Sequence, residues 1–229
     1  MEFGGLEKFT LIDYPGKIAC IIFTIGCNFR CGFCHNPELV NCNVTERIKE
    51  KEILDFLESR KGLLEGVTIT GGEPTMHGER LLNFIRKVKV MGFLVKLDSN
   101  GTNPDILQKA IDEKIIDYIA MDIKAPFAKY KEVTMRLDDL DSIKKSVKLI
   151  MESEIDYEFR TTVVKSQLSF EDFDVIGEEI RGAKNYYLQK FIPTKILDES
   201  FKNEHTYSDE EFKLLKEKMD GYVENCGIR

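Results

Sequence analysis

Short runs of β-branched and apolar residues alternate along the chain with longer stretches whose apolar residues recur every three or four positions. The short runs predict strands over residues 18–24, 67–70, 94–98, 118–123, 157–164 and 186–192. The longer stretches predict helices over residues 45–59, 78–91, 104–114, 140–152, 169–181 and 208–224. Thr45 and Asn103 are the expected N-caps of the first and third helices, and Pro104 suits a first helical turn.

This order gives six β-α units, which predict an α/β fold with a parallel sheet and right-handed crossovers. Several of the predicted strands are almost continuously apolar, as expected for strands covered on both faces. The pattern leaves open whether the sheet is doubly wound or barrel-like. It contains no repeat, low-complexity linker or break in composition, so we expect one domain over residues 1–229.

Composition and charge narrow the class of protein. Hydrophobic residues make up 42% of the 229 positions and charged residues 32%, with a formal net charge of −7. An acidic chain is a poor candidate for nucleic-acid binding, which usually requires a basic face. The first residues lack the pattern of a signal peptide, and the longest apolar run, 18–25, is too short to span a membrane. We therefore expect a cytoplasmic protein with neither nucleic acid nor membrane as a partner.

The unusual residues fall where predicted strands end. The motif C-x3-C-x2-C (Cys27, Cys31, Cys34) follows the first strand, Gly-Gly-Glu-Pro (71–74) the second, and Asp-Ser-Asn-Gly (98–101) the third. Asp122 and Lys124 end the fourth strand, and Arg160 lies within the fifth. Because the carboxyl ends of parallel strands share one edge of a sheet, these residues are expected to form one site.

The three clustered cysteines indicate a metal centre. A chain of this size and composition is an unlikely disulfide scaffold, and thiolates suit iron–sulfur clusters and zinc. Three thiolates on a four-iron cluster would leave one iron open to a small molecule. The alternative is a structural zinc site with His35 or Cys42 as the fourth ligand. Cys20 is expected to be a core thiol, and Cys42 and Cys226 are expected to be incidental.

The glycine pair Gly71-Gly72 would let backbone approach a ligand closely at the end of the second strand, where Glu73 could hold an amine. Taken alone, such a pair also fits a tight β-α turn. Its position one β-α unit after the three cysteines favours a ligand site.

These motifs carry a resemblance to a known family. GCNFRCGFCHNPEL at residues 26–39, followed by GGEP, resembles the radical S-adenosylmethionine (SAM) superfamily. Together with LIDYPGK at residues 11–17, the string resembles the activating enzymes of glycyl-radical enzymes. It is most similar to the anaerobic ribonucleoside-triphosphate reductase activating type, with pyruvate formate-lyase activating enzyme as a near relative. The resemblance runs from about residue 8 through at least residue 193, and it implies a partial (β/α)6 TIM-like barrel.

The resemblance also implies roles for individual residues. Cys27, Cys31 and Cys34 would ligate one [4Fe-4S] cluster, and the open iron would bind the amino and carboxylate groups of SAM. The SAM site would be lined by Phe33, His35 and Asn36 around the adenine; by Gly71, Gly72 and Glu73 at the amino group; by Asp98, Ser99 and Asn100 near the ribose and carboxylate; and by Asp122, Lys124 and Arg160. Asp98 and Asp122 are also candidate ligands of a monovalent cation.

The implied activity is anaerobic. An electron donor such as flavodoxin or ferredoxin reduces the cluster, SAM is cleaved, and the resulting radical takes a hydrogen atom from a glycine of a partner enzyme. Two alternatives remain: a radical SAM enzyme acting on a small molecule such as a nucleoside or cofactor precursor, and a non-enzymatic zinc-binding module. The sequence departs from formate-lyase relatives at residues 188–193, LQKFIP, where those proteins carry a histidine.

Overall fold

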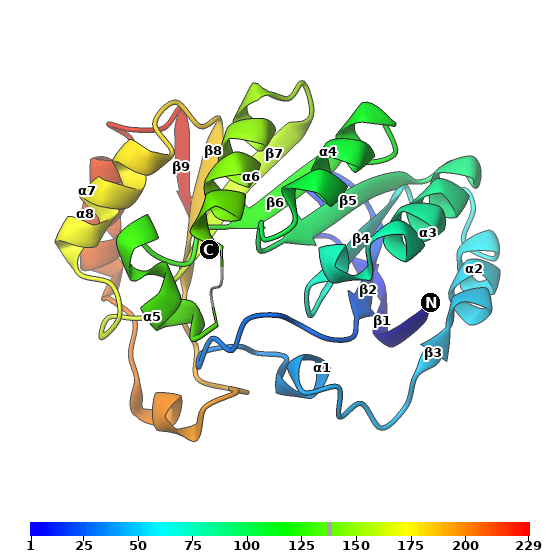
Figure 1. Cartoon of the computed structure of the whole chain (residues 1–229), viewed down its shortest axis with the longest axis horizontal. Coiled ribbons are helices and arrows are strands. Elements are labelled where there is room, and N and C mark those ends of the chain that lie inside the picture. Colours follow the sequence, from blue (N-terminus) through cyan, green and yellow to red (C-terminus); the bar gives the residue numbers. More distant parts are fainter. Residues whose placement is uncertain (137–138) are drawn as a thin grey trace.

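A computed structural model describes residues 1–136 and 139–229 of the chain. Its centre is a nine-stranded sheet in the order β3-β1-β2-β4-β5-β6-β7-β8-β9 (Figure 1). The strands are β1 (Glu2–Thr10), β2 (Ala19–Thr24), β3 (Ile48–Lys49), β4 (Gly66–Gly71), β5 (Leu94–Ser99), β6 (Tyr118–Asp122), β7 (Asp156–Val163), β8 (Asn185–Lys190) and β9 (Asn225–Ile228). From β2 onward, β3 aside, the strands follow the order of the chain, as expected for consecutive β-α units.

The sheet is mostly parallel. Strands β2 and β4 to β9 pair in parallel, whereas β1 pairs antiparallel with both β2 and β3. This confirms the predicted α/β class, and the curved sheet is a partial TIM-like barrel. The six predicted strands correspond to β2 and β4 to β8. The sequence analysis missed β1, β3 and β9.

Glycines explain why β1 escaped prediction. Gly4 and Gly5 weaken its strand signal, because glycine has no side chain to pack on a sheet. The structure requires the glycine at position 4, since a Cβ there would lie only 2.2 Å from Cδ2 of Leu39. β3 and β9 are simply short, with two and four residues.

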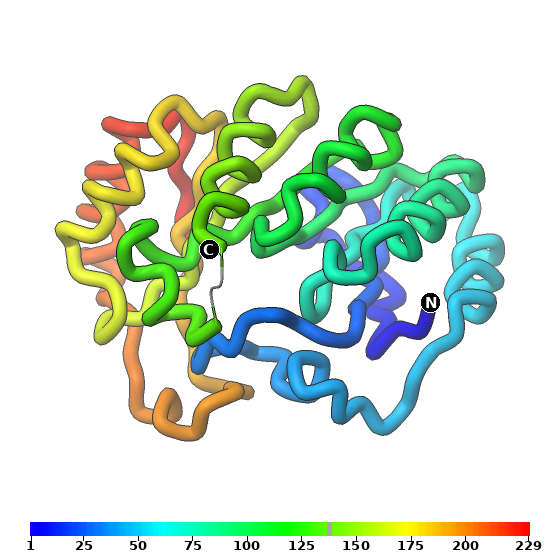
Figure 2. Tube along the Cα trace, in the orientation of Figure 1, coloured from blue at the N-terminus to red at the C-terminus, as the bar shows by residue number. Residues whose placement is uncertain are grey.

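The helices are α1 (Pro37–Val40), α2 (Glu50–Glu58), α3 (Glu79–Val90), α4 (Pro104–Asp112), α5 (Tyr130–Thr134), α6 (Leu140–Glu152), α7 (Phe170–Glu179) and α8 (Asp209–Met219). Three short 3-10 turns, η1 (Pro74–His77), η2 (Phe127–Lys129) and η3 (Glu199–Asn203), follow strands β4, β6 and β8. The longer helices lie along one side of the sheet, and the cysteine-bearing segment crosses the other side (Figures 1 and 2). The six predicted helices are present, and α1 and α5 were missed.

One predicted helix cap is wrong, and the other is correct in position but makes no capping hydrogen bond. Thr45 does not begin α2, because Ile48 is extended and pairs with Phe3 of β1. The helix begins after Lys49, whose N–H donates to Glu52 at 2.7 Å. Asn103 precedes α4 as expected, but its side chain does not cap the helix. It donates instead to the carbonyl of Thr75 at 2.9 Å, which ties α4 to the turn after β4.

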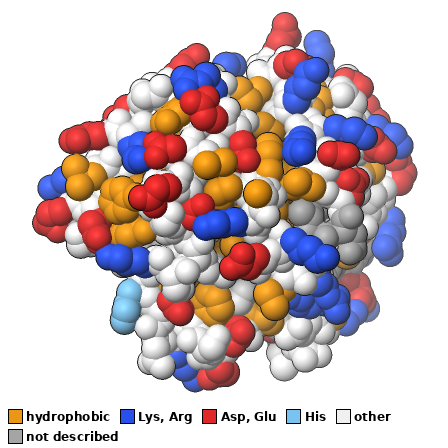
Figure 3. Space-filling view, turned by 60° about the vertical axis from the view of Figure 1, so that its left-hand side comes forward, with side chains coloured by type: hydrophobic (Ala, Val, Ile, Leu, Met, Phe, Trp, Pro, Cys, Tyr) orange, Lys and Arg blue, Asp and Glu red, His pale blue; other side chains and the backbone are white. Residues whose placement is uncertain are grey.

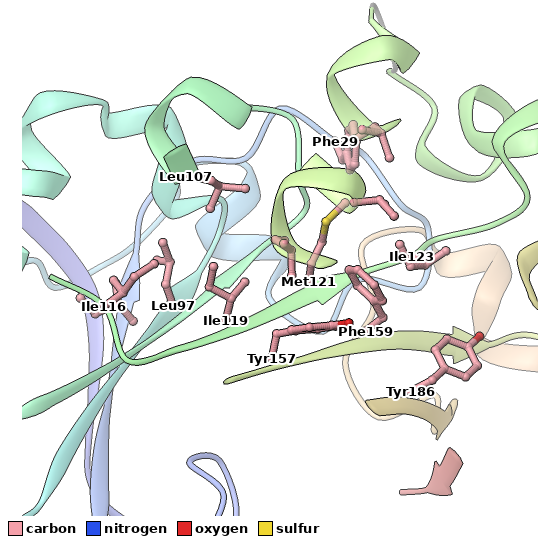
Figure 4. Packing of buried hydrophobic residues seen from close by; sticks show 14 of the residues in the cluster. Phe29, Leu97, Leu107, Ile116, Ile119, Met121, Ile123, Tyr157, Phe159 and Tyr186 are labelled. Carbon is pink, nitrogen blue, oxygen red and sulfur yellow. The ribbon is translucent and has the colours of Figure 1, made fainter. Parts of the chain in front are cut away.

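The central strands separate apolar and charged residues by face. Successive side chains point to opposite faces of a strand. Leu97 of β5 and Ile119 of β6 are adjacent in register, and both project toward Leu107 of α4 (Figure 4). Asp98 directly follows Leu97, and Asp122 lies three positions after Ile119, so both carboxylates are on the opposite face of their strands. The central strands are thus largely buried on both faces, as expected, and the inner face of β5 to β7 carries the charged side chains.

The face of the molecule drawn in Figure 3 carries Lys, Arg, Asp and Glu side chains, interspersed with smaller groups of hydrophobic side chains. Within residues 1–136 and 139–229, no helix has the length and apolar character needed to cross a lipid bilayer.

Candidate functional site

One cavity opens at the carboxyl ends of the parallel strands, and it brings together every residue that the sequence singled out for the site. Its volume is about 830 Å3 when the open, solvent-filled mouth is included. It is lined by Cys27, Cys31, Phe33, Cys34, His35, Asn36, Gly71, Gly72, Glu73, Asp98, Ser99, Asn100, Asp122, Lys124 and Arg160. The predicted convergence of distant motifs is therefore present in the fold.

The cysteine loop is residues 25–36, between β2 and α1. Its first half is fixed to the end of β5 by amide side chains. Asn100 Nδ2 donates to Asn28 Oδ1 at 2.8 Å and approaches Cys27 Sγ at 4.0 Å. Asn28 Nδ2 in turn donates to Thr102 Oγ1 at 2.8 Å. The N–H of Phe29 also points at Cys27 Sγ, at 3.4 Å. Cys27 therefore sits among hydrogen-bond donors that favour a thiolate or a metal-bound sulfur.

All three motif cysteines are free thiols in a largely buried setting. Burial raises the pKa of Cys27 to about 12 and that of Cys31 to about 11, and it also raises the pKa of Cys34. The Lys124 ammonium opposes this shift at each of the three sulfurs. Metal binding requires thiolates, so a metal centre bound here would displace three protons. Three soft donors along one loop suit an iron–sulfur cluster.

No group of three or more His, Cys, Asp or Glu side chains within the described residues is arranged to hold a single metal ion. Cys42, weighed above as a zinc ligand, is exposed and lies in a left-handed turn with φ of 59°. Cys20 and Cys226 are buried free thiols.

The end of β4 approaches the cysteine loop through backbone alone. A Cβ on Gly72 would lie 1.9 Å from the carbonyl oxygen of Gly26, and one on Gly71 would lie 2.4 Å from the backbone nitrogen of Thr24. The N–H of Glu73 donates to that same Gly26 carbonyl at 2.7 Å. Both glycines are therefore required by close packing beside Cys27, which is the reason for the Gly-Gly pair.

We expect Gly72→Ala to lower the free energy of unfolding by about 1–3 kcal/mol, because two backbone segments must separate. The same shift should weaken iron binding, since Gly26 precedes Cys27. Urea unfolding and iron content measure the two effects. Gly221→Ala, at an exposed position, is the control and should change stability by less than about 1 kcal/mol. Equal losses in the two variants would contradict the packing argument.

Glu73 is a buried connector between β4 and β5. Its Oε1 accepts from Thr75 and from Ser99 Oγ at 2.9 Å, and its Oε2 accepts from the N–H of Asn100 at 2.6 Å. Burial raises the pKa of this carboxyl, although the hydrogen bonds from Thr75, Asn100 and Ser99 act to lower it. Glu73 thus fixes the two strand ends on which Gly72 and Asn100 are carried.

Charged side chains of β5, β6 and β7 form a network on the floor of the cavity. The Arg160 guanidinium bridges Asp98 at 3.2 Å and Asp122 at 3.1 Å. Lys96 binds the other oxygen of Asp98, and Lys124 binds the other oxygen of Asp122 at 2.8 Å. Burial raises the pKa of Asp122, but Lys124 and Arg160 outweigh it and lower that pKa to about 2.

This network bears on the expected monovalent cation. Each of the four carboxylate oxygens of Asp98 and Asp122 already accepts a hydrogen bond from a cationic side chain. A further cation would meet three positive groups and no free oxygen on these residues, so the pair does not fit one in this arrangement. The cation remains a prediction from the resemblance alone.

Sequence reasoning missed four residues that also line the cavity: Phe29, Val40, Thr70 and Thr162. Thr162 lies two positions after Arg160 on β7, so strand alternation could have identified it. Thr70 directly precedes Gly71. Phe29 and Val40 carry no signal beyond their closeness to the cysteines.

The comparisons with known proteins agree with this site. The profile of the radical SAM superfamily matches residues 21–179, which include the cysteine motif and strands β4 to β7. The chain therefore belongs to the radical SAM superfamily. Membership of this superfamily implies a [4Fe-4S] cluster and SAM as cofactors. It is an enzyme.

Sequence relatives narrow the class to glycyl-radical enzyme activating enzymes. A Methanocaldococcus jannaschii protein named "putative glycyl-radical enzyme activating enzyme" is 33% identical over 98% of this chain and 94% of its own length. The pyruvate formate-lyase-activating enzyme of Clostridium pasteurianum is 30% identical over 52% of this chain and 51% of its own. The match to formate-lyase relatives thus spans about half of each chain.

Solved structures share the fold at low sequence identity. Streptococcus suis SuiB bound to its precursor peptide SuiA superposes with a TM-score of 0.67 at 16% identity, over 91% of this chain and 48% of that one. TYW1 with a lysine-pyruvate adduct superposes with a TM-score of 0.62 at 17% identity, over 89% and 73%.

Proposed function

We propose that the chain activates a glycyl-radical enzyme, and that the partner is an anaerobic ribonucleoside-triphosphate reductase. The observation that carries the proposal is the placement of three free cysteines, with no fourth, on the wall of a cavity that also contains the Gly71-Gly72 backbone. This donor set fits a [4Fe-4S] cluster with one iron left open for SAM. The resemblance of the sequence to the reductase-activating type supports the choice of partner.

In this proposal Cys27, Cys31 and Cys34 hold the cluster. A [4Fe-4S] cluster held there and reduced by a flavodoxin or ferredoxin would supply the electron for cleavage of SAM to methionine and a 5′-deoxyadenosyl radical. The backbone of Gly71-Gly72 binds the methionine amino group. Glu73 fixes that backbone, because its carboxylate is already occupied by Thr75, Ser99 and Asn100. Asn36 and His35 lie at the mouth of the cavity beside the space proposed for the adenine.

Lys124 has a second role in the proposal, through charge. Its ammonium lies 5.7 Å from the centre of the Phe33 ring and acts on all three motif sulfurs. Because this positive charge acts to lower the pKa of all three thiols, it stabilises thiolates and would favour binding of the anionic cluster. Asp122 holds Lys124 in place at 2.8 Å.

The open shape of the sheet supports a protein as substrate. The strand order runs from β3 to β9 and does not close on itself. An extended loop of a partner could therefore reach the cavity and present a glycine α-carbon to the radical. The relatives named for glycyl-radical enzymes support the same class of partner.

The test is anaerobic incubation of the reconstituted, reduced chain with SAM and the candidate partner enzymes. We expect a glycyl-radical signal in electron paramagnetic resonance spectra of the reductase, and none when its radical-bearing glycine is replaced by alanine. SAM cleavage without a radical in any candidate would reject the proposal and favour a small-molecule substrate. Radical formation only in a formate lyase would keep the activity and reject the named partner.

A further inference from the structure

A segment after β8 lies against the cysteine loop. Residues 191–204, which we call the strap, leave the end of β8 and include η3 before the chain continues to α8. In the tube view the strap (orange) and the cysteine loop (blue) come together in the lower part of the molecule (Figure 2). Contacts between the two segments confirm that they are neighbours.

Polar contacts join the strap to the second half of the cysteine loop. The N–H of Asp198 donates to the carbonyl of Gly32 at 3.0 Å. His35 Nδ1 lies 3.0 Å from the carbonyl of Lys195, and since a carbonyl only accepts, this nitrogen carries the proton. The Lys195 ammonium reaches Glu38, just after the loop, at 2.7 Å.

Aromatic packing supplies the rest of the contact. Phe201 covers Gly32 so closely that a Cβ on this glycine would lie 2.2 Å from the Phe201 ring. The same ring lies 6.4 Å from that of Phe33, centre to centre. Phe191 stacks on His35 at 6.0 Å and meets Phe201 edge-on at 6.4 Å. Such pairs stabilise beyond the area that they bury.

The two halves of the loop are therefore held by different elements. Cys27 is fixed by Asn28 and the end of β5. Between Cys31 and Cys34 lie Gly32 and Phe33, and their contacts to Phe201 and Asp198 come from the strap. Glycine adds backbone freedom to this half, so external contacts matter more for its conformation.

We propose that the strap is the positioning element for Cys31 and Cys34, and that Phe201 is its principal contact. The inference rests on the proposed cluster. Phe201 acts by holding Gly32 and Phe33 so that the thiols on either side keep the spacing that a cluster needs. A loop without this cover samples more conformations and loses its cluster faster.

The first test compares Phe201→Ala with Phe9→Ala in the full chain. Phe9 is 55% exposed on β1, at the opposite end of the sheet from the site, so it controls for loss of a partly exposed ring. After anaerobic reconstitution, we expect iron release to a chelator to be about tenfold faster in Phe201→Ala and unchanged in Phe9→Ala. Phe201→Leu should restore much of the retention. Equal rates for Phe201→Ala and the unmodified chain would overturn the proposal.

A second readout does not depend on the cluster. In the metal-free chain, we expect amide hydrogen exchange of residues 31–36 to accelerate in Phe201→Ala, while residues 98–102, held by Glu73, exchange as before. If the unmodified chain takes up no cluster, the proposed function fails. Amide hydrogen exchange then remains as the test of whether the strap holds residues 31–36. Unchanged exchange at residues 31–36 would overturn the strap's role even if the enzyme is active.

A size swap tests the direct contact. Gly32→Ala should clash with Phe201 and speed iron release, and adding Phe201→Ala should recover part of that loss, because the smaller side chain makes room. The spectrum of the reduced cluster should shift in Gly32→Ala and move back in the double variant. Purely additive effects would show that Gly32 and Phe201 do not act through each other, contrary to the proposal.

Discussion

A chain in which Cys27, Cys31 or Cys34 is replaced by serine is expected to bind almost no cluster iron and to lose reductive cleavage of SAM. Serine oxygen is a harder donor than thiolate and stays protonated at neutral pH, so each variant removes one of only three ligands. We expect activity to fall by more than about a hundredfold, beyond the roughly 10–100-fold typical of residues outside the ligand shell. Iron and sulfide analysis and chromatographic assay of 5′-deoxyadenosine measure the two losses.

Cys42→Ser and Cys226→Ser are the matched controls for this prediction. Cys42 is exposed and Cys226 is buried on β9. Both variants should keep full iron content and activity. If Cys42→Ser lost iron as severely as Cys27→Ser, a fourth protein ligand would be indicated and the open coordination site would be excluded.

Replacing Arg160 with methionine is expected to lower the free energy of unfolding by about 3–5 kcal/mol at neutral pH. The variant would leave Asp98 and Asp122 without their shared partner in a buried setting, and breaking such a pair on one side costs about this much. Methionine keeps much of the apolar stem of arginine, so the loss of stability measures the effect of removing the charge. Urea unfolding measures it.

The loss should also depend on pH, with a defined sign. The pKa of Asp122 is lowered to about 2 in the folded chain, below the value of about 3.9 usual for an unfolded aspartate. The stability from the ion pair is therefore fully present above pH 4 and is lost as pH falls toward 2. The difference between Arg160→Met and the unmodified chain should shrink over that window.

Arg86→Met is the control for Arg160. Arg86 also bridges two carboxylates, Glu79 and Glu113, but on the surface. Surface pairs contribute little and are screened by salt, so this loss should be small and should vanish at high ionic strength. Equal, salt-sensitive losses in both variants would contradict the buried network.

The sequence was sufficient to predict the fold class and most of the residues that line the cavity. Parallel strands place their carboxyl ends at one edge, so Cys27, Gly72, Asp98 and Asp122 converge for a topological reason that does not depend on side-chain detail. The alternation of charge in Lys96-Asp98 and Glu158-Arg160 was also present in the sequence. It indicates that the inner face of β5 and β7 is polar.

Other features depend on contacts that a sequence pattern cannot encode. Asn103 has the residue type of a helix cap, but its side-chain amide donates a hydrogen bond to the carbonyl of Thr75 in η1. The strap has no regular periodicity, and its role rests on a glycine in one segment meeting a phenylalanine in another. The ion pairing of Asp98 and Asp122 likewise depends on the direction in which the Arg160 side chain extends from β7.

The contact between the cysteine loop and the strap has a consequence for biosynthesis. Most neighbouring strands of the sheet are also near neighbours in sequence, so they can pair soon after they are made. His35 and Lys195, in contrast, are 160 residues apart. The three thiols thus leave the ribosome about 160 residues before the strap that completes their loop. Stable cluster insertion is therefore expected only after the strap has been synthesised and has packed on the cysteine loop.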